Sequence, residues 1–284
     1  MKRILVASDF SNCAGNAMEY AMELAKILKM DVYVIHAIGV TEGVFNNIYN
    51  AIYIEDYYNK KRKALAAWAN AYTNRDEFKN IRVTTLCDVG SLSSVISNYI
   101  KSNPVELVVI GTMGATGILG LFGSNASLIV EKIKTPTLII PTESKFSKDP
   151  VITFATDFSS NLSEEDVEAL NVLLEAFGSE KLNVLNVNES TELGSNEAGE
   201  NVLKNLINKA KMEFTYISKS NAVDGIMNFI DSSQTDILFL VKRHYSLIYR
   251  IFNRSTVNQV MNRSVKAILV LHEYASVTSP GKTE

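Results

Sequence analysis

The sequence contains few of the residues that build disulfide-rich, metal-binding or membrane-spanning proteins. Its 284 residues include only two cysteines, Cys13 and Cys87, which are too few for a disulfide framework. The three histidines, His36, His244 and His272, show no metal-ligand spacing with one another, with cysteine or with carboxylates. No apolar run approaches the roughly 20 residues of a membrane span. We therefore expect neither structural disulfides, nor a metal centre, nor a transmembrane helix.

An excess of charge of one sign is also absent. The chain has 28 lysines and arginines against 31 acidic residues, which gives a net charge of −3. Such a balanced chain has no basic footprint for nucleic acid or for an anionic membrane surface, and we expect neither partner. The apolar run after Lys2 and Arg3 is too short for the core of a signal peptide, so we expect a cytoplasmic protein.

What the sequence does contain is an alternation of strand-like and helix-like segments. A chain of this length is expected to form two domains, and its apolar fraction of 46% is sufficient for packed cores. The strands predicted in the first half are residues 3–8, 31–37, 81–86, 106–110 and 137–140. The helices predicted between them are residues 14–28, 54–73, 91–101 and 126–134. This order is typical of a parallel sheet covered by helices. Residues 142–150 are polar, end in proline and are predicted to be a linker.

The second half of the chain repeats the first. Within residues 151–159, residues 152–159 resemble residues 4–11 at an offset of 148, with Asp157 in the place of Asp9. Residues 236–240 resemble residues 106–110 at an offset of 130, which continues through the last predicted strand. We therefore predict two tandem domains, 1–142 and 150–275. The two offsets make the second domain 18 residues shorter, and the connection over residues 38–60 is the expected place of the loss.

A glycine-rich segment, residues 111–125, lies between the fourth strand and the following helix. Five of the fourteen glycines of the chain are at positions 111, 114, 117, 120 and 123. Such a turn presents backbone N–H groups and the positive end of a helix dipole, which suit a phosphate. The segment has neither the Gly-Lys-Ser/Thr of a Walker A loop nor the Gly-x-Gly-x-x-Gly of dinucleotide folds. We therefore do not expect fast phosphoryl transfer.

The repeat allows the glycine-rich segment to be compared with its counterpart in the second domain. The residues opposite the five glycines are Val241, His244, Leu247, Arg250 and Asn253. Their side chains would keep the backbone away from a phosphate. The second domain is thus predicted to be degenerate, with the scaffold kept and the ligand lost.

Two short patterns resemble the universal stress protein (UspA) family. They are Asp-Phe-Ser at residues 9–11, after the first strand, and Gly-x-x-Gly at residues 111–114, followed by Gly-Ser at residues 123–124. The resemblance covers residues 1–142 and 150–273. It implies an α/β fold with two tandem doubly wound domains, Rossmann-like and similar to the adenine nucleotide alpha hydrolases, with parallel five-stranded sheets. Members with the glycine motif bind ATP, so the resemblance implies ATP, alone or with Mg²⁺, in the first domain.

The same resemblance assigns roles to individual residues. It implies that Ser8 and Asp9 lie near the adenine and ribose, and that the backbone of Ala37 meets the base. The residues implied to hold ribose and phosphates are Gly111, Met113, Gly114, Gly123, Ser124 and Asn125. The spacer 115–122 is one residue shorter than the spacing usual in the family. No catalytic residue is assigned.

Simpler structural roles are also open for some of these residues. Asp9 can cap the following helix instead of contacting ribose, and Asp157 is expected to be only a cap. We expect His36 to be a core residue with a satisfied hydrogen bond and Cys13 to be a small packing residue.

Three functions follow as hypotheses. The first is a stress-response or regulatory protein that binds an adenine nucleotide in its first domain. The second is a slow ATP hydrolase, and the third is a dimerisation scaffold without a ligand. In the resembling family the last strand of each domain pairs with its partner. We therefore expect an intrachain pseudo-dimer of the domains, while a further homodimer and the identity of a protein partner stay open.

Overall fold

Ten apolar segments form strands in the part of the chain that the structure describes, and successive residues of each strand face opposite sides of the sheet. The computed structural model describes residues 3–40, 42, 51–113, 124–158, 162–188, 196–242 and 256–273. The strands are β1 Arg3–Ala7, β2 Asp31–Ile38, β3 Val83–Val89, β4 Leu107–Thr112, β5 Thr137–Pro141, β6 Ile152–Ala155, β7 Lys181–Asn188, β8 Lys211–Ser218, β9 Ile237–Lys242 and β10 Ala267–His272.

The helices connect these strands in a βαβ pattern in each half of the chain. They are α1 Asn12–Leu28, α2 Ala51–Thr73, α3 Leu92–Ser102, α4 Ser124–Lys132, α5 Glu164–Ala176, α6 Glu197–Leu206, α7 Ala222–Ser232 and α9 Thr256–Arg263, with a short 3₁₀ helix, η1, at Asp76–Phe78. The predicted elements are confirmed, although their ends differ by a few residues. For example, β3 begins at Val83 rather than at residue 81.

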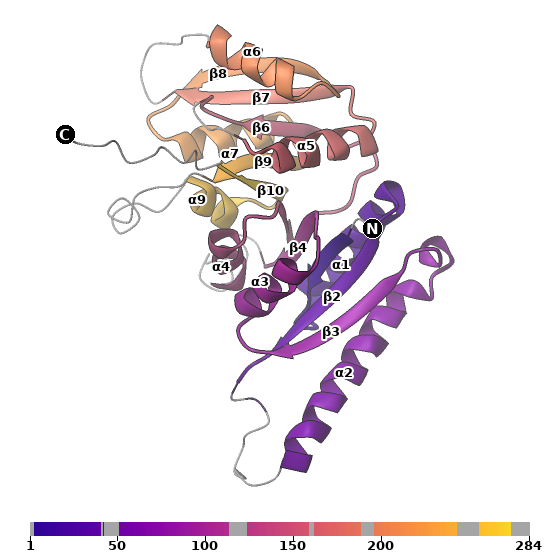
Figure 1. Cartoon of the computed structure of the whole chain (residues 1–284). Helices are drawn as coiled ribbons and strands as arrows, with labels where there is room; N and C mark the ends of the chain where they lie inside the picture. The colour runs from indigo at the N-terminus through magenta and orange to yellow at the C-terminus, as the bar shows by residue number, and fades with distance from the viewer. Residues whose placement is uncertain are drawn as a thin grey trace, which may run out of the picture.

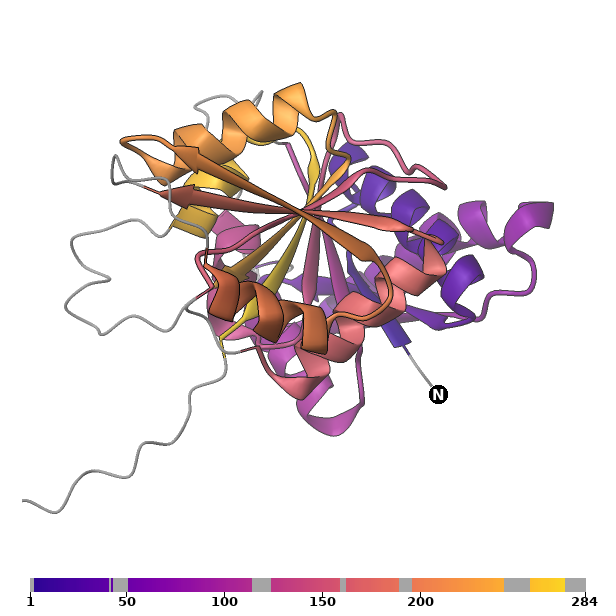
Figure 2. The same ribbon diagram turned by 90° about the horizontal axis from the view of Figure 1, so that it is seen from above.

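All ten strands belong to one sheet, in the order β3-β2-β1-β4-β5-β10-β9-β6-β7-β8 (Figure 1). Each half contributes five parallel strands, and the second half repeats the order of the first in reverse. The two halves meet at β5 and β10, which pair antiparallel. The register is reciprocal, with Leu138 opposite Leu269 and Ile139 opposite Ile268. The sheet is strongly twisted, as the view along it in Figure 2 shows.

Helices cover both faces of the sheet (Figure 2). Helices α1, α2, α5 and α6 pack on one face, over a core that contains Val6, Val34, Val109 and Phe154. Helices α3, α4, α7 and α9 pack on the other face, over the neighbouring inward residues such as Leu5. The chain therefore has the predicted α/β architecture of two tandem doubly wound domains.

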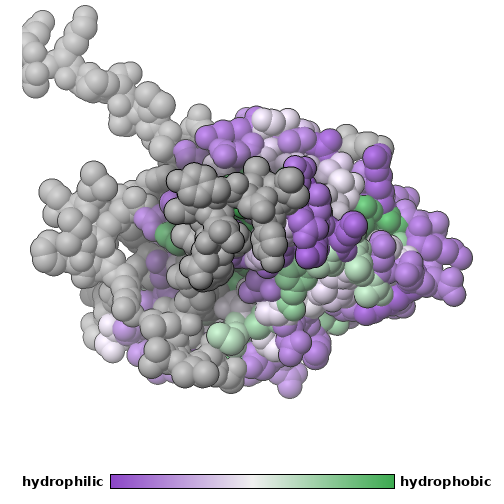
Figure 3. Space-filling model, turned by 90° about the horizontal axis from the view of Figure 1, so that it is seen from below, coloured by the Kyte–Doolittle hydropathy of each residue, from purple (hydrophilic) through white to green (hydrophobic). Residues whose placement is uncertain are grey.

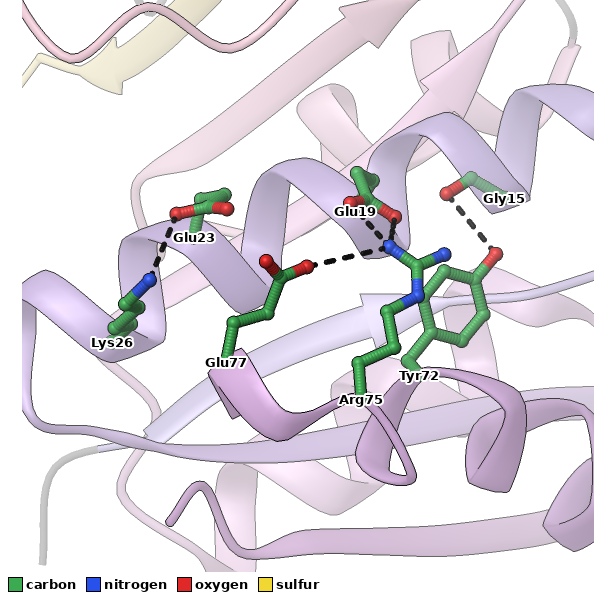
Figure 4. Close-up of polar contacts among 7 residues, drawn as sticks. All are labelled: Gly15, Glu19, Glu23, Lys26, Tyr72, Arg75 and Glu77. Carbon is green, nitrogen blue, oxygen red and sulfur yellow. Dashed lines mark hydrogen bonds and ion pairs between the residues drawn. The ribbon is translucent and has the colours of Figure 1, made fainter. Parts of the chain in front are cut away.

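The long helix α2 is fastened to α1 by polar contacts at its C-terminal end (Figure 4). Arg75 Nη1 donates to both carboxylate oxygens of Glu19, at 2.6 and 2.8 Å. The hydroxyl of Tyr72 donates to the carbonyl of Gly15 at 3.3 Å. In the second domain the corresponding helix, α6, has 10 residues against 23 in α2. The shortening of the second domain thus lies between its second and third strands.

The segment between the two domains packs against the protein instead of crossing solvent as a polar linker. The ring of Phe146 lies 5.1 Å from that of Tyr20 in α1 and 5.9 Å from that of Phe177, after α5. The side-chain amide of Asn16 donates to the carbonyls of Pro141 and Ser144, both at 2.9 Å. These contacts fill one side of the junction between the domains.

The described surface is mostly hydrophilic on the face shown in Figure 3, with smaller apolar areas between polar side chains. In the part of the chain that the structure describes, no helix combines the length and apolar character needed to cross a bilayer. The two cysteines, Cys13 and Cys87, are free.

Candidate functional site

The carboxyl ends of β2, β1 and β4 come together at one edge of the sheet. Ala7, at the end of β1, pairs with Ile35 of β2 on one side and with Ile110 of β4 on the other. The chain order reverses between β1 and β4, which makes this edge the topological switch point of the first domain. In open α/β sheets, ligands bind in the crevice outside the carboxyl ends of the strands at such a point.

Ser8 and Asp9 form a tight turn as soon as β1 ends. Ser8 is only 4% exposed, and its N–H donates to the carbonyl of Ile35 at 2.8 Å. Its hydroxyl accepts from the N–H of Phe10 at 3.2 Å, and Phe10 has a φ of +66°. Asp9 is exposed, and its Oδ1 accepts from the N–H of Ser11 at 3.0 Å. The turn leaves Asp9 exposed at this edge of the sheet.

The capping role that the sequence left open for Asp9 is excluded, and the one predicted for Asp157 is wrong. Helix α1 is capped by Ser11, whose hydroxyl accepts from the N–H of Ala14 at 3.2 Å. Helix α5 is capped by Ser163 in the same way. Asp9 lies two residues before the cap of α1, and its carboxylate stabilises the turn rather than the helix terminus.

His36 supports this turn from the neighbouring strand. Its Nδ1 lies 2.8 Å from the carbonyl oxygen of Ser8, and its ring centroid lies 4.6 Å from that of Phe10. The residue is 6% exposed, so the prediction of a core histidine is confirmed. Its second nitrogen, Nε2, is buried without a hydrogen-bond partner. The prediction that the histidine is hydrogen-bonded therefore holds for one of its two ring nitrogens. The contact with Ser8 could not be read from the sequence, because the two residues lie on different strands.

The second domain contains the same turn without the glycines. The N–H of Thr156 donates to the carbonyl of Leu185 at 2.9 Å, and the N–H of Phe158 donates to the hydroxyl of Thr156 at 3.0 Å. Phe158 has a φ of +63°, and the side-chain amide of Asn186 replaces His36 by donating to the carbonyl of Thr156 at 2.9 Å. This turn is therefore part of the shared scaffold, and by itself it does not indicate a ligand.

Gly111, near the end of β4, has a packing reason to be glycine. A Cβ at this position would clash with the carbonyl oxygen of Cys13 and lie 2.9 Å from the nitrogen of Ala14, at the start of α1. The second domain has Val241 at the corresponding position. In the second domain β6 ends 148 residues after the end of β1, but Ser163, the cap of α5, comes 152 residues after Ser11, the cap of α1. The connection between strand and helix is therefore longer in the second domain. The longer connection allows α5 a different position, so that a side chain is tolerated.

The other predicted nucleotide-binding residues lie around the same edge or outside the described residues. Ala37 lies two residues beyond Ile35, the last residue of β2 that pairs with β1. Met113 directly follows β4 and is 55% exposed. Ser124 and Asn125 are the first two residues of α4. Gly114 and Gly123 lie outside the described residues.

A polar cluster ties the end of β2 to α2. Glu42 accepts hydrogen bonds from the N–H of Gly39 at 3.0 Å and from the hydroxyl of Tyr57 at 2.8 Å. Lys61 lies 3.2 Å from the same carboxylate. These partners, with the Gly39 N–H first, lower the pKa of Glu42 to about 2. Tyr57 thus acts as a hydrogen-bond donor to Glu42. The sequence did not indicate this pairing.

No group of three or more His, Cys, Asp and Glu side chains that could hold a metal ion occurs among the residues described. This edge of the first domain offers the exposed carboxylate of Asp9, backbone at the strand ends and the start of helix α4. This set suits the hydroxyl groups and phosphates of a nucleotide.

Comparison with known proteins agrees with this architecture. Residues 1–141 match the model of the Universal stress protein family. Universal stress protein YxiE of Bacillus subtilis is 24% identical over 145 residues, which are 49% of this chain and 97% of that protein. The present chain belongs to the universal stress protein family, as a member with two tandem domains.

Solved structures share the whole two-domain fold. A universal stress protein from Archaeoglobus fulgidus superposes with a TM-score of 0.76 and 19% identity, over 95% of this chain and 98% of that one. A protein of unknown function from Pseudomonas aeruginosa superposes with a TM-score of 0.61 and 13% identity, over 95% and 92% of the two chains. At these identities the likeness establishes the fold.

Proposed function

We propose that the first domain, residues 1–142, binds an adenine nucleotide such as ATP, and that the protein acts as a nucleotide-responsive stress or regulatory protein. One observation carries the proposal: Ser8 and Asp9, Ala37, and the stretch from Gly111 to Met113 meet at the switch point of a doubly wound sheet. In this proposal Asp9 accepts from the ribose hydroxyls, and the backbone of Ala37 meets the base.

The phosphates would lie toward the start of α4, where Ser124 and Asn125 are the first residues. The free N–H groups and the dipole at a helix N-terminus favour anions, so a nucleotide would need no lysine at this end. Gly111, Met113, Gly114 and Gly123 complete the proposed site. Mg²⁺ would accompany the phosphates as part of the ligand. Occupancy would change the surface that this edge presents to a partner.

The second domain, residues 150–275, supplies a matched control for this proposal. Asp157 is exposed and follows β6 as Asp9 follows β1. We expect Asp9→Ala to weaken binding of a fluorescent ATP analogue by about tenfold, because charged hydrogen bonds to hydroxyls are lost. Asp157→Ala should leave the affinity unchanged, and wild type should bind one nucleotide per chain. Equal effects of the two variants, or two nucleotides per chain, would contradict the proposal.

We also propose that the two domains form an intrachain pseudo-dimer. The reciprocal register of β5 and β10 supports this arrangement, since each strand covers an edge that the other would leave exposed. The chain should therefore sediment as a monomer in analytical ultracentrifugation. A stable dimer would mean that another surface, and not β5 or β10, joins two chains.

A further inference from the structure

The junction between the domains is filled on one side and hollow on the other. On the filled side, Tyr20 and Phe177 pack around Phe146 of the connecting segment. On the other side lies a cavity of about 520 Å³, between the C-terminal end of α1, the beginnings of β4 and β5, helix α5 and the end of β10. A volume of this size suits a small organic molecule.

The two helices at the junction explain this difference when they are aligned on their caps, Ser11 and Ser163. Nine residues after the cap, α1 has Tyr20, whereas α5 has the smaller Val172. Among the described residues, the connecting segment passes the first of these two places, where Phe146 packs on Tyr20. Val172 consequently lines a cavity where Tyr20 and Phe146 close the equivalent space.

The walls of the cavity combine apolar side chains with carboxylates. The apolar lining includes Leu28, Met30, Leu107, Val172 and Leu173. The acidic lining consists of Glu106, Glu165, Asp166, Glu168 and Glu273. The basic side chains in the lining are Lys134, which is exposed, and the buried imidazole of His272. The field in the cavity therefore favours a cation, and the apolar wall favours a hydrocarbon body.

Asp166 is the most buried of these carboxylates, with 2% of the residue exposed. Its Oδ2 accepts from the hydroxyl of Ser163 at 2.9 Å and from the N–H of His272 at 3.3 Å. Its Oδ1 is buried without a hydrogen-bond partner. Three residues after its own cap, α1 has Ala14 instead. A buried carboxylate with a vacant acceptor is costly unless a donor reaches it, and a bound ammonium group would supply that donor.

We propose that this cavity, which we call the seam cavity, binds a small organic cation, with its ammonium group directed toward Asp166 and its apolar part against Leu107 and Val172. This site is separate from the proposed nucleotide site. It lies at the junction with the second domain, and its acidic lining would repel a phosphate.

The proposal can be tested on the full chain with two probes that differ in charge. Phenethylamine is a cation at neutral pH, and 2-phenylethanol is its neutral analogue. In ligand-observed NMR titrations we expect phenethylamine to bind at least about tenfold more tightly, because a charge-assisted hydrogen bond is available only to the amine. Equal binding of the two probes, or no binding of the amine up to about 10 mM, would overturn the proposal.

Variants locate the site. Asp166→Asn should weaken amine binding by about tenfold, and Val172→Trp should abolish it by filling the cavity. Lys134→Glu should strengthen it by replacing a positive charge of the lining with a negative one, a gain that misfolding cannot produce. Glu197→Gln, on the distant helix α6, is the matched control and should change nothing. Unchanged binding in the Asp166 and Val172 variants, or competition by ATP, would place the amine elsewhere and refute the proposal.

Discussion

Burial of Asp166 makes the stability of this protein depend on pH in an unusual direction. Burial raises the pKa of Asp166 from 3.8 to about 6, although hydrogen bonds from Ser163 and His272 oppose the shift. Because the pKa is higher in the folded state, the folded state binds the proton more tightly. The resulting stabilisation is complete below the unfolded pKa of 3.8 and is lost as the pH rises through 6. A shift of this size corresponds to about 3 kcal/mol.

The variant Asp166→Asn cannot ionise and should lack this dependence. We expect the difference in unfolding free energy between wild type and variant to change by about 2–3 kcal/mol between about pH 4 and about pH 7.5, with wild type favoured at the acidic end. Urea denaturation at a series of pH values measures the difference. Any constant cost of the buried amide cancels in this comparison.

The control is Glu197→Gln, which removes an exposed acid and retains Asp166. It should follow wild type at every pH. If the Asp166→Asn and wild-type curves run parallel over the whole range, the carboxyl is not desolvated in the folded protein and the reasoning fails.

Three further predictions concern other parts of the molecule. Gly111→Ala should destabilise the protein by about 2 kcal/mol or more without any nucleotide present, since the added Cβ meets backbone; an unchanged urea midpoint would show that the glycine serves only a ligand. Tyr57→Phe should raise the pKa of Glu42, observed by carboxyl NMR titration, because one donor is lost; an unmoved pKa would contradict the described contact. Leu269→Ala, in the fully buried β10, should cost about 3 kcal/mol in urea unfolding, and a cost below about 1 kcal/mol would mean that the strand pair is not packed as described.

The fold could be predicted from the sequence because its signals are local and repeated. Apolar strands alternate with amphipathic helices, and the offsets of 148 and 130 align the two halves. The first, fourth and fifth strands of the first half were therefore supported by counterparts in the second. The number of strands and the α/β class follow from this consistency.

The helix caps could not be assigned in this way. Asp9 and Ser11 are both good capping residues, and only the backbone turn at Phe10, with its positive φ, makes Ser11 the cap. The prediction for Asp157 failed because helix α5 begins further along the chain, after Ser163. The decision depends on how the chain leaves β1, which is a property of the folded backbone.

The candidate site was predictable in part. That Ser8, Ala37 and Gly111 meet at one edge follows from the strand order of the family the chain resembles. The packing role of Gly111 against Cys13 does not, because the contact depends on how closely α1 approaches β4. The sequence did not indicate that Asp166 is buried either. Together with Glu164 and Glu165 it has the pattern of a solvated first turn of a helix, and it is buried only because α5 packs at the junction between the domains.

The joining of β5 to β10 within one chain has a consequence for how this protein can change over generations. In a pair of identical subunits, every substitution in the shared strand appears twice, once on each side of the axis. Here Leu138 faces Leu269, and each is encoded separately. A substitution on one strand can therefore be followed by a compensating one on the other. The duplicated gene can thus improve or specialise one half of the junction while the other half maintains the fold.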